Sequence, residues 1–399
     1  MNFEKLEAFV EDFYSNYKHV RLNKWNYEDG CILLAAIELY EATGERKYRD
    51  FVIGYLDAYV EEDGVIRHYC REEYNLDNIC PGRGLLFAFK ETGEKKYKKA
   101  ASTLMSQLAS QPRTQEGSFW HKKIYPCQVW LDGLFMAQPF YMAWDIRFGG
   151  GGHCDDIIRQ FENVRSRMFD EKKKLYYHGY DETHSIFWAD RGTGCSANCW
   201  LRAECWYLMA IVDTLEEFAG KEKVLKTAGP TEESKEAARG MCGQLLNRET
   251  AVKLAALYRE GIDGLLRYRD RESRLFFQIP DCPELAGNYV ETSGSAMAAA
   301  SILKACRLGI LEDETYWDIG REIMEELAER KLVQTEDGRT VLTDVCHVAG
   351  LGPEPGRRDG SAAYYLSEPR GYDDNKGNAA LFMAYAQYFM GKGTSTAFR

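Results

Sequence analysis

One stretch of this chain repeats at an offset of 49 residues, from position 41 to position 90, and this repeat strongly constrains the fold. The segment Glu41-Ala42-Thr43-Gly44-Glu45-Arg46-Lys47-Tyr48 recurs as Lys90-Glu91-Thr92-Gly93-Glu94-Lys95-Lys96-Tyr97. The same offset aligns Trp25-Asn26-Tyr27-Glu28 with Tyr74-Asn75-Leu76-Asp77, and Val129-Trp130-Leu131-Asp132 resembles both. Each unit indicates a loop, a helix, a turn and a second helix, because the glycine suits the left-handed residue that ends a helix. Helical hairpins repeated at this spacing predict a solenoid or a closed toroid.

Helical periodicity runs through the chain and predicts an all-α protein. After a first helix over residues 3–17, further helices are expected at 30–42, 46–61, 82–91, 94–110, 133–147, 154–168, 198–219, 233–246, 250–267, 293–307, 313–330 and 377–391. Strand signals are short, at 174–178, 275–278 and 340–342, and they do not alternate with helices as a parallel sheet requires. Twelve helices after the first make about six hairpins. This number predicts an (α/α)6 barrel, formed as one domain over residues 1–399, with short β segments in its rim loops.

The long loops before the inner helices are expected to share one rim, where function in such a fold concentrates. These loops are 61–81, 111–131, 170–197, 268–292 and 340–376. The repeat places Asp77 and Asp132 at equivalent positions on this rim, before neighbouring inner helices. Two carboxylates there are the minimum for acid/base chemistry on a glycoside. Either residue could equally serve as a helix N-cap, because an aspartate accepts the free N–H groups of a first turn.

The richest candidate segment lies between residues 170 and 206. Arg202 stands between Trp200 and Trp206, and such an arginine can bind a carboxylate while the rings hold a sugar. The alternative is an arginine stacked on aromatic rings for packing. His178, in the sequence His-Gly-Tyr-Asp, is a candidate hydrogen-bond donor to a substrate hydroxyl or carboxylate.

Composition narrows the class of partner. A net charge of −11 argues against a nucleic-acid or anionic-membrane binder, whereas 13% aromatic residues suit a sugar-stacking cleft. Twelve cysteines without a C-x-x-C motif favour a reducing compartment. The charged N-terminus lacks a signal-like apolar core, and no apolar run reaches membrane-spanning length. We therefore expect a cytoplasmic protein that needs no metal or cofactor and binds a small oligosaccharide. The oligomeric state stays open.

Six motifs, in this order, resemble those of glycoside hydrolase family 105, the unsaturated rhamnogalacturonyl hydrolases and their relatives. They are Val129-Trp130-Leu131-Asp132-Gly133-Leu134-Phe135-Met136, His178-Gly179-Tyr180-Asp181, Trp188-Ala189-Asp190, Trp200-x-Arg202-x-x-x-Trp206, Glu291-Thr292-Ser293-Gly294-Ser295-Ala296-Met297 and Tyr365-Leu366-Ser367-Glu368-Pro369. The resemblance covers nearly the whole chain and implies an (α/α)6 barrel. It implies that Asp132 is the catalytic general acid. The substrate-binding residues that we expect are Asp77, Trp130, His178, Trp200, Arg202 and Trp206.

The reaction implied by the resemblance is hydration of a vinyl ether, which releases a 4-deoxy-hex-4-enuronic acid from the non-reducing end of a lyase-generated oligosaccharide. Asp132 would protonate C4, so its pKa must be raised by burial and by a neighbouring carboxylate such as Asp77. Arg202 would hold the uronate carboxylate. Cys205 stands where the family usually has a glycine, and its bulk could narrow the pocket or shift Trp206.

Other functions remain open on the sequence. One is an unsaturated glucuronyl hydrolase for another acidic polysaccharide. A sugar epimerase would need a pair of histidine bases, of which His178 is the one in a convincing place. An inverting glycosidase would need two catalytic carboxyls roughly 6.5–9.5 Å apart. A non-catalytic carbohydrate-binding toroid is the fourth alternative, because helical-repeat surfaces often bind partners.

Overall fold

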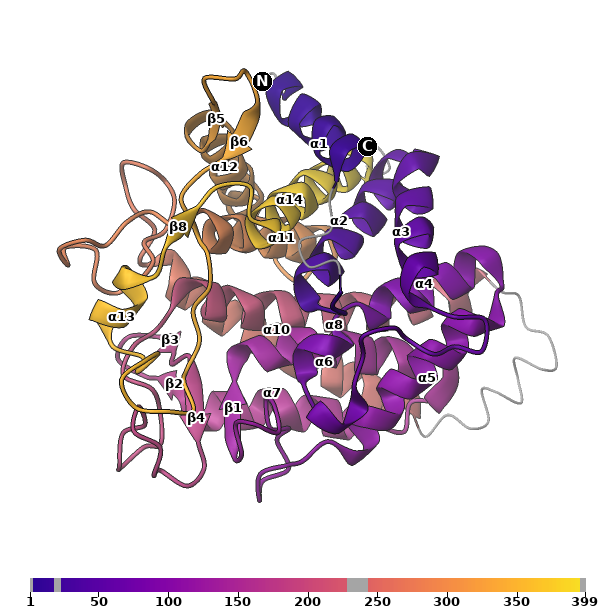
Figure 1. The fold of residues 1–399 in the computed structure, drawn as a ribbon, viewed down its shortest axis with the longest axis horizontal. Coiled ribbons are helices and arrows are strands. Elements are labelled where there is room, and N and C mark those ends of the chain that lie inside the picture. The colour runs from indigo at the N-terminus through magenta and orange to yellow at the C-terminus, as the bar shows by residue number, and fades with distance from the viewer. Residues whose placement is uncertain (1–2, 18–22, 228–242, 395–399) are drawn as a thin grey trace.

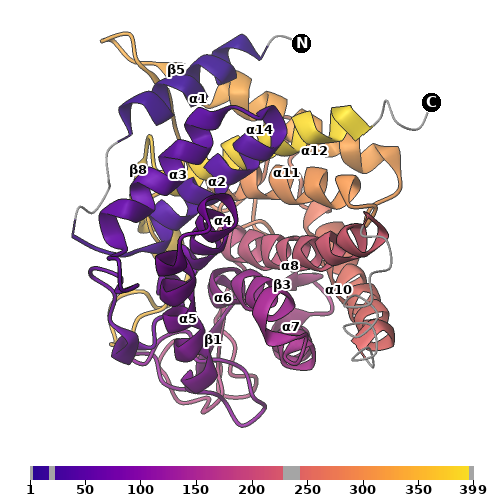
Figure 2. The same ribbon diagram turned by 90° about the vertical axis from the view of Figure 1, so that its right-hand side faces the viewer.

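A computed structural model describes residues 3–17, 23–227 and 243–394 of the chain. Its architecture is an (α/α)6 barrel, in which an inner ring of helices is surrounded by an outer layer (Figures 1 and 2). Within the described residues the inner helices are α2 (Tyr27–Thr43), α4 (Gly82–Thr92), α6 (Leu131–Trp144), α8 (Leu201–Thr227), α11 (Thr292–Arg307) and α14 (Asn375–Thr394). Each contacts the next in this order, and α14 returns to α2, so the ring is closed. The outer helices are α1 (Glu4–Asn16), α3 (Arg46–Tyr59), α5 (Lys95–Ser110), α7 (Cys154–Met168), α10 (Gly243–Leu266) and α12 (Glu314–Arg330).

The two layers differ in how their residues are patterned. In the inner helix α6 every residue is buried except Asp132 and Trp144, because the helix contacts other parts of the barrel on all sides. The outer helix α7 buries one stripe, formed by Cys154, Ile157, Ile158, Gln160, Phe161, Val164 and Met168. A stripe at this spacing is the pattern of a helix with one face toward the core and one toward solvent. Of the two exceptions in α6, Asp132 is the informative one, because it stands at the end of the helix that faces the rim.

The 49-residue repeat of the sequence is a repeat of structure. Gly44 and Gly93 end α2 and α4 in the left-handed conformation, with φ of 73° and 74°. The side chain of Asn26 caps α2, and that of Asn75 caps the short 3-10 helix η2 (Leu76–Ile79) that precedes α4. Equivalent residues therefore begin and end equivalent elements. Asp77 lies in η2 rather than on α4 itself.

The barrel closes differently from the predicted six consecutive hairpins. The last inner helix, α14, pairs with the first helix of the chain: Phe9 packs edge-on against Phe382 at 5.6 Å, and the hydroxyl of Tyr385 donates to Glu7 at 2.7 Å. The sixth pair thus joins the two ends of the chain (Figure 2). Residues 233–242 of the helix expected at 233–246 lie outside the described residues, and the remainder belongs to α10.

Short antiparallel strand pairs connect the rim loops, and with α13 they gather at one end of the helices (Figure 1). The pairs are β1 (Gln128–Trp130) with β4 (Gly179–Asp181), β2 (Phe169–Asp170) with β3 (Leu175–Tyr176), β5 (Leu332–Gln334) with β6 (Thr340–Leu342), and β7 (Val345–Cys346) with β8 (Arg370–Gly371). The remaining short elements are η1 (Arg71–Glu73), η3 (Asp145–Gly149) and α13 (Ala362–Ser367). The strand expected at 275–278 is reduced to one bridge between Phe277 and Val290, since Pro280 has no N–H to extend the ladder.

The pairing of β1 with β4 positions the candidate site. Trp130 lies opposite Gly179, and the amide of Leu131 donates to the carbonyl of His178 at 3.1 Å. This register brings the first turn of α6 beside His178. Among the described residues, no helix is both long and apolar enough to span a membrane.

Candidate active site

A pocket of about 200 Å³ opens at the rim, where the segments before α2, α4 and α6 meet the loop 340–376. Its acidic lining residues are Glu28, Asp77 and Asp132, its basic ones Lys24, Lys122 and Arg358, and its aromatic ones include His121, Tyr125 and Trp130. Two of the acids, Asp77 and Asp132, were expected together on this rim. Glu28, the third, occupies the corresponding position in the first copy of the repeat.

Asp132 faces this pocket without serving as a helix cap. It lies in the first turn of α6, whose N-cap residue is Trp130, and no side chain caps that helix end. The carboxylate is instead 3.1 Å from Nε2 of His178. Nδ1 of His178 is in turn 2.7 Å from the hydroxyl of Tyr365. His178 is fully buried, so these two contacts fix the orientation of its ring behind Asp132.

The pKa of Asp132 is lowered, contrary to the prediction from the sequence. Burial is the largest influence and acts to raise this pKa, but the charge of His178 and its hydrogen bond act in the opposite direction and, with the charge of His121, outweigh burial. Asp77 does not supply the expected repulsion, because its own charge is balanced by the lysine next to it. In the unliganded protein Asp132 is therefore ionised at neutral pH.

The other two acids of the pocket are each neutralised by a lysine. Asp77 contacts Nζ of Lys122, and its second oxygen lies 3.6 Å from Nε2 of His121. Glu28 accepts from Nζ of Lys376 at 3.1 Å. Burial lowers the pKa of His121 to about 4, so this ring is neutral near pH 7. Asp132 differs from both other acids because its partner is the imidazole of His178 rather than the ammonium group of a lysine.

One wall of the pocket is a stack of rings. Trp130 lies nearly parallel to His121, with centroids 4.4 Å apart, and to Tyr125, with centroids 4.7 Å apart. The indole N–H of Trp130 donates to Gln128 at 3.1 Å. Flat aromatic faces of this kind match the apolar faces of a pyranose. Trp130 lines the pocket, and its contact with substrate stays a prediction.

Arg202 is not among the residues that line the pocket. Its guanidinium is buried inside the barrel, where it donates to the hydroxyl of Ser293 at 3.0 Å and to the carbonyl of Cys346 at 2.6 Å. It also lies 4.8 Å from the ring centroid of Trp200, which is the packing arrangement considered as the alternative. To bind a substrate carboxylate, this side chain would have to leave these partners. Its role as the uronate ligand therefore stays a prediction, without support from this geometry.

The two tryptophans of the same motif lie behind the pocket rather than in its lining. Trp200 packs against His178, with ring centroids 4.9 Å apart, and Trp206 packs against Phe135 at 4.4 Å. Both indoles are almost completely buried, so their predicted contacts with substrate are not visible here. Cys205 is also buried and does not line the pocket, so the predicted narrowing is not seen.

Most residues of the lining were not predicted from the sequence, and four of them matter for the chemistry near Asp132: His121, Lys122, Tyr125 and Arg358. All four belong to loops that were expected on the rim, the first three to 111–131 and Arg358 to 340–376. Charged and aromatic residues within those loops are the signal that could have identified them. Their proximity to Asp132 depends on the way the barrel brings distant loops together.

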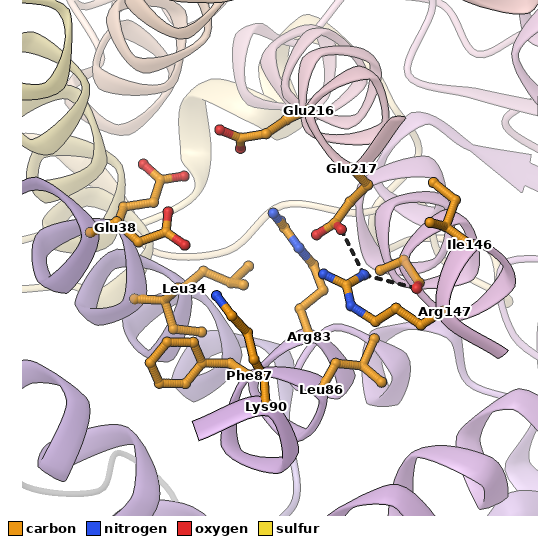
Figure 3. Close-up of a pocket in the computed structure, with 13 residues that line it drawn as sticks. Leu34, Glu38, Arg83, Leu86, Phe87, Lys90, Ile146, Arg147, Glu216 and Glu217 are labelled. Atoms are coloured by element: carbon orange, nitrogen blue, oxygen red, sulfur yellow. Dashed lines mark hydrogen bonds and ion pairs between the residues drawn. The ribbon is translucent and has the colours of Figure 1, made fainter. Parts of the chain in front are cut away.

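A second, larger cavity of about 650 Å³ lies toward the C-terminal ends of α2, α6 and α8 (Figure 3). Glu38, Arg83, Lys90, Arg147 and Glu217 are among its lining residues. Arg147 donates to Glu217 at 2.8 Å, an ion pair visible in Figure 3. The cavity lies away from Asp132. Glu38, Arg83 and Glu216 are paired with charged residues outside its lining.

Beside this cavity, Glu38, Asp213 and Glu216 come close enough together to hold a cation. The ammonium group of Lys304 lies among them, 2.5 Å from Glu38 and from Asp213 and 3.1 Å from Glu216. This buried network joins α2, α8 and α11 through charge, and the lysine takes the place that a metal ion would occupy.

Comparison with known proteins identifies the family. The profile of glycosyl hydrolase family 88 matches residues 6–392. The solved structure of a family 105 glycoside hydrolase from C. acetobutylicum ATCC 824 is 36% identical in sequence, with a TM-score of 0.82 over 96% of this chain and 98% of that chain. The chain belongs to the family 88/105 glycoside hydrolases.

This family 88/105 hydrolase is also similar in sequence to two further proteins. The protein Atu3128 of Agrobacterium fabrum is 36% identical over 256 residues, which cover 63% of this chain and 97% of the relative. The unsaturated rhamnogalacturonyl hydrolase YesR of Bacillus subtilis is 25% identical over 290 residues, covering 71% of this chain and 72% of YesR.

Proposed function

We propose that this glycoside hydrolase removes a 4-deoxy-hex-4-enuronic acid residue from the non-reducing end of lyase-generated oligosaccharides. Asp132 is the acid and base of the reaction, and Asp77 and Trp130 contact the sugar. Unsaturated rhamnogalacturonan disaccharides are the expected substrates, by analogy with the activity in the name of YesR.

The observation that carries this proposal is the difference between the three acids of the pocket. Asp77 and Glu28 are each paired with the ammonium group of a lysine, whereas Asp132 is paired with a histidine. Ordinary glycosidases need two catalytic carboxyls, one of them an acid and the other a base or nucleophile. Hydration of an enol ether needs a single group that gives a proton and takes one back. The pocket offers one such group, which favours this chemistry over an inverting glycosidase.

The reaction balances with one water molecule. The proton of Asp132 is transferred to C4, and the π electrons of C4=C5 form the new C–H bond, leaving positive charge shared by C5 and the ring oxygen. Water adds to C5 and gives its proton to the Asp132 carboxylate, producing a hemiketal. The C5–O5 bond then breaks to form a ketone, and the hemiacetal at C1 collapses to an aldehyde as the aglycone alcohol leaves.

His178 provides a route by which Asp132 becomes protonated. A sugar that fills the pocket excludes water from Asp132, and loss of water raises the pKa of a carboxylic acid. Since Nε2 of His178 is 3.1 Å from the carboxylate, a proton can move between the two groups without crossing bulk solvent. Tyr365 holds the far nitrogen of the ring, so the imidazole keeps its orientation during the transfer.

A panel of lyase-generated unsaturated disaccharides tests the proposal, because the enol ether absorbs in the ultraviolet and its hydration removes that absorbance. We expect loss of absorbance with the native protein, fastest on the rhamnogalacturonan-derived disaccharide. Faster reaction with a glycosaminoglycan-derived disaccharide would overturn the substrate assignment alone. Binding without any absorbance loss across the panel would contradict the hydrolase proposal and favour a carbohydrate-binding toroid.

A further inference from the structure

Arg358 is a cation of the rim pocket that the described residues leave without an acidic partner. It lies in the loop 340–376 and lines the same pocket as Asp132. Nε of its guanidinium is buried and has no hydrogen-bond partner among the described residues, and no ion pair of Arg358 occurs there. A buried donor without a partner is unfavourable in the free protein, and such donors commonly await a ligand or an ordered water.

The loop holds Arg358 in a defined place. Its backbone has a φ of 57°, in the left-handed region that residues with a β-carbon seldom adopt and that persists where the surroundings fix it. The carbonyl of Arg358 accepts from the amide of Gly352 at 2.8 Å, and the amide of Gly350 donates to the hydroxyl of Tyr364 at 3.0 Å. The guanidinium is therefore presented to the pocket by a loop that is tied at two points.

Gly350 allows this guanidinium and the aromatic wall to approach each other. The ring of Trp130 lies 3.4 Å, and Nη1 of Arg358 3.6 Å, from the position that a β-carbon on Gly350 would occupy. The indole and the guanidinium thus border the same small space. A sugar ring stacked on Trp130 would have its substituents within reach of Arg358.

The other cations near the pocket are less suited to an anionic substrate. Lys122 is engaged with Asp77, and Lys376 with Glu28. Lys24 lines the pocket but is exposed to solvent, so its charge is well hydrated. The guanidinium of Arg358 combines partial burial with free donors, and its planar fork matches the two oxygens of a carboxylate.

We propose that Arg358 binds the C6 carboxylate of the unsaturated uronate and sets the requirement for an acidic sugar in this pocket. This assignment rests on the proposed function, since it names the residue that recognises the charged group of that substrate. It transfers to Arg358 the role expected of Arg202 from the sequence. The contact is made in the bound substrate and in the transition state alike, so its loss raises KM more than it lowers kcat.

The test compares an unsaturated uronide disaccharide with its C6 methyl ester, which has the same ring and enol ether but no charge. We expect the native protein to prefer the free acid in kcat/KM by about 100-fold, the range that a charge-assisted bidentate pair supplies. Arg358→Gln should lose most of this preference, through a higher KM for the acid and little change for the ester. Arg358→Lys should retain part of it. Arg357→Gln removes an exposed neighbouring charge and should behave as the native protein.

The outcomes separate this proposal from the proposed function. If Arg358→Gln keeps the native preference for the free acid, or lowers kcat/KM equally for the acid and the ester, then Arg358 does not bind the carboxylate and the proposal is wrong. If the native protein turns over neither compound, the hydrolase assignment has failed. Calorimetric binding of the acid and the ester to native and Arg358→Gln protein then still decides whether Arg358 selects the charged form. Circular dichroism checks that each variant is folded.

Discussion

The imidazole of His178 and the carboxylate of Asp132 form a hydrogen-bonded pair, with Nε2 and Oδ2 3.1 Å apart. The two residues are 46 positions apart in the chain, and the β1–β4 pairing brings them together. Tyr365, 187 positions beyond His178, holds the other ring nitrogen. Three separate rim segments therefore build one hydrogen-bonded unit at the site.

The pH dependence of the reaction should reflect the protonation of Asp132. Because the pKa of Asp132 is lowered in the free protein, the protonated fraction grows as the pH falls, and kcat/KM should rise from neutral toward acidic pH. Bound sugar excludes water and raises this pKa. The descending limb of the pH–rate profile should therefore lie at higher pH for kcat than for kcat/KM. Initial rates over a pH series measure both limbs. Limbs at the same pH, or a kcat/KM that rises with pH, would argue against this account.

Two substitutions of His178 separate its two hydrogen bonds. Asparagine keeps a polar atom near Nδ1, facing Tyr365, but cannot reach Asp132, whereas glutamine keeps a donor near Nε2. Since His178 lowers the pKa of Asp132, losing the contact should raise that pKa and move the limb of kcat/KM to higher pH. We expect His178→Asn to shift the limb further than His178→Gln and to reduce kcat by at least about 10-fold, as for a misplaced acid/base group. Equal activity loss without any shift of the limb would indicate a packing role alone.

The buried charge network beside the second cavity should contribute mainly to stability. Lys304→Met leaves Glu38 without its cation, while Asp213 keeps Arg83 and Glu216 keeps Arg307. Breaking a buried ion pair typically costs about 3–5 kcal/mol. Lys90→Met, at an exposed lysine of the same cavity, should change the free energy of unfolding by less than about 0.5 kcal/mol. Urea denaturation of the two variants and the native protein measures the difference. Similar free energies of unfolding for the two variants would mean that the network does not stabilise the fold as predicted.

Local chemistry explains why much of the fold could be predicted from the sequence. The ends of α2 and α4 are set by residues within each repeat, such as Asn26 at the start of α2 and Gly44 and Gly93 at the ends. The same repeat led to Asp77 and Asp132 being expected on one rim, and both line the pocket. The pairing of α1 with α14 was not predicted, because it joins the two ends of the chain through tertiary packing.

Long-range contacts explain why the roles of the basic residues were harder to predict. The Trp-x-Arg-x-x-x-Trp spacing around Arg202 suggested a substrate ligand, but its partner, the carbonyl of Cys346, lies 144 positions away in the chain. Arg358 has no comparable motif around it, and it reaches the pocket only through the path of the loop 340–376. Neither the free donors of Arg358 nor the lysine that neutralises Asp77 can be inferred from spacing.

The central claim, that Asp132 protonates C4 of an unsaturated uronide, is tested most directly by running the reaction in D2O and following the early product by NMR. The account predicts one deuterium at C4, delivered to a single face, with Asp132→Asn slower by about 100-fold or more and still folded. A product that keeps the C4=C5 bond and gains no deuterium, or an Asp132→Asn variant with near-native rates, would contradict it.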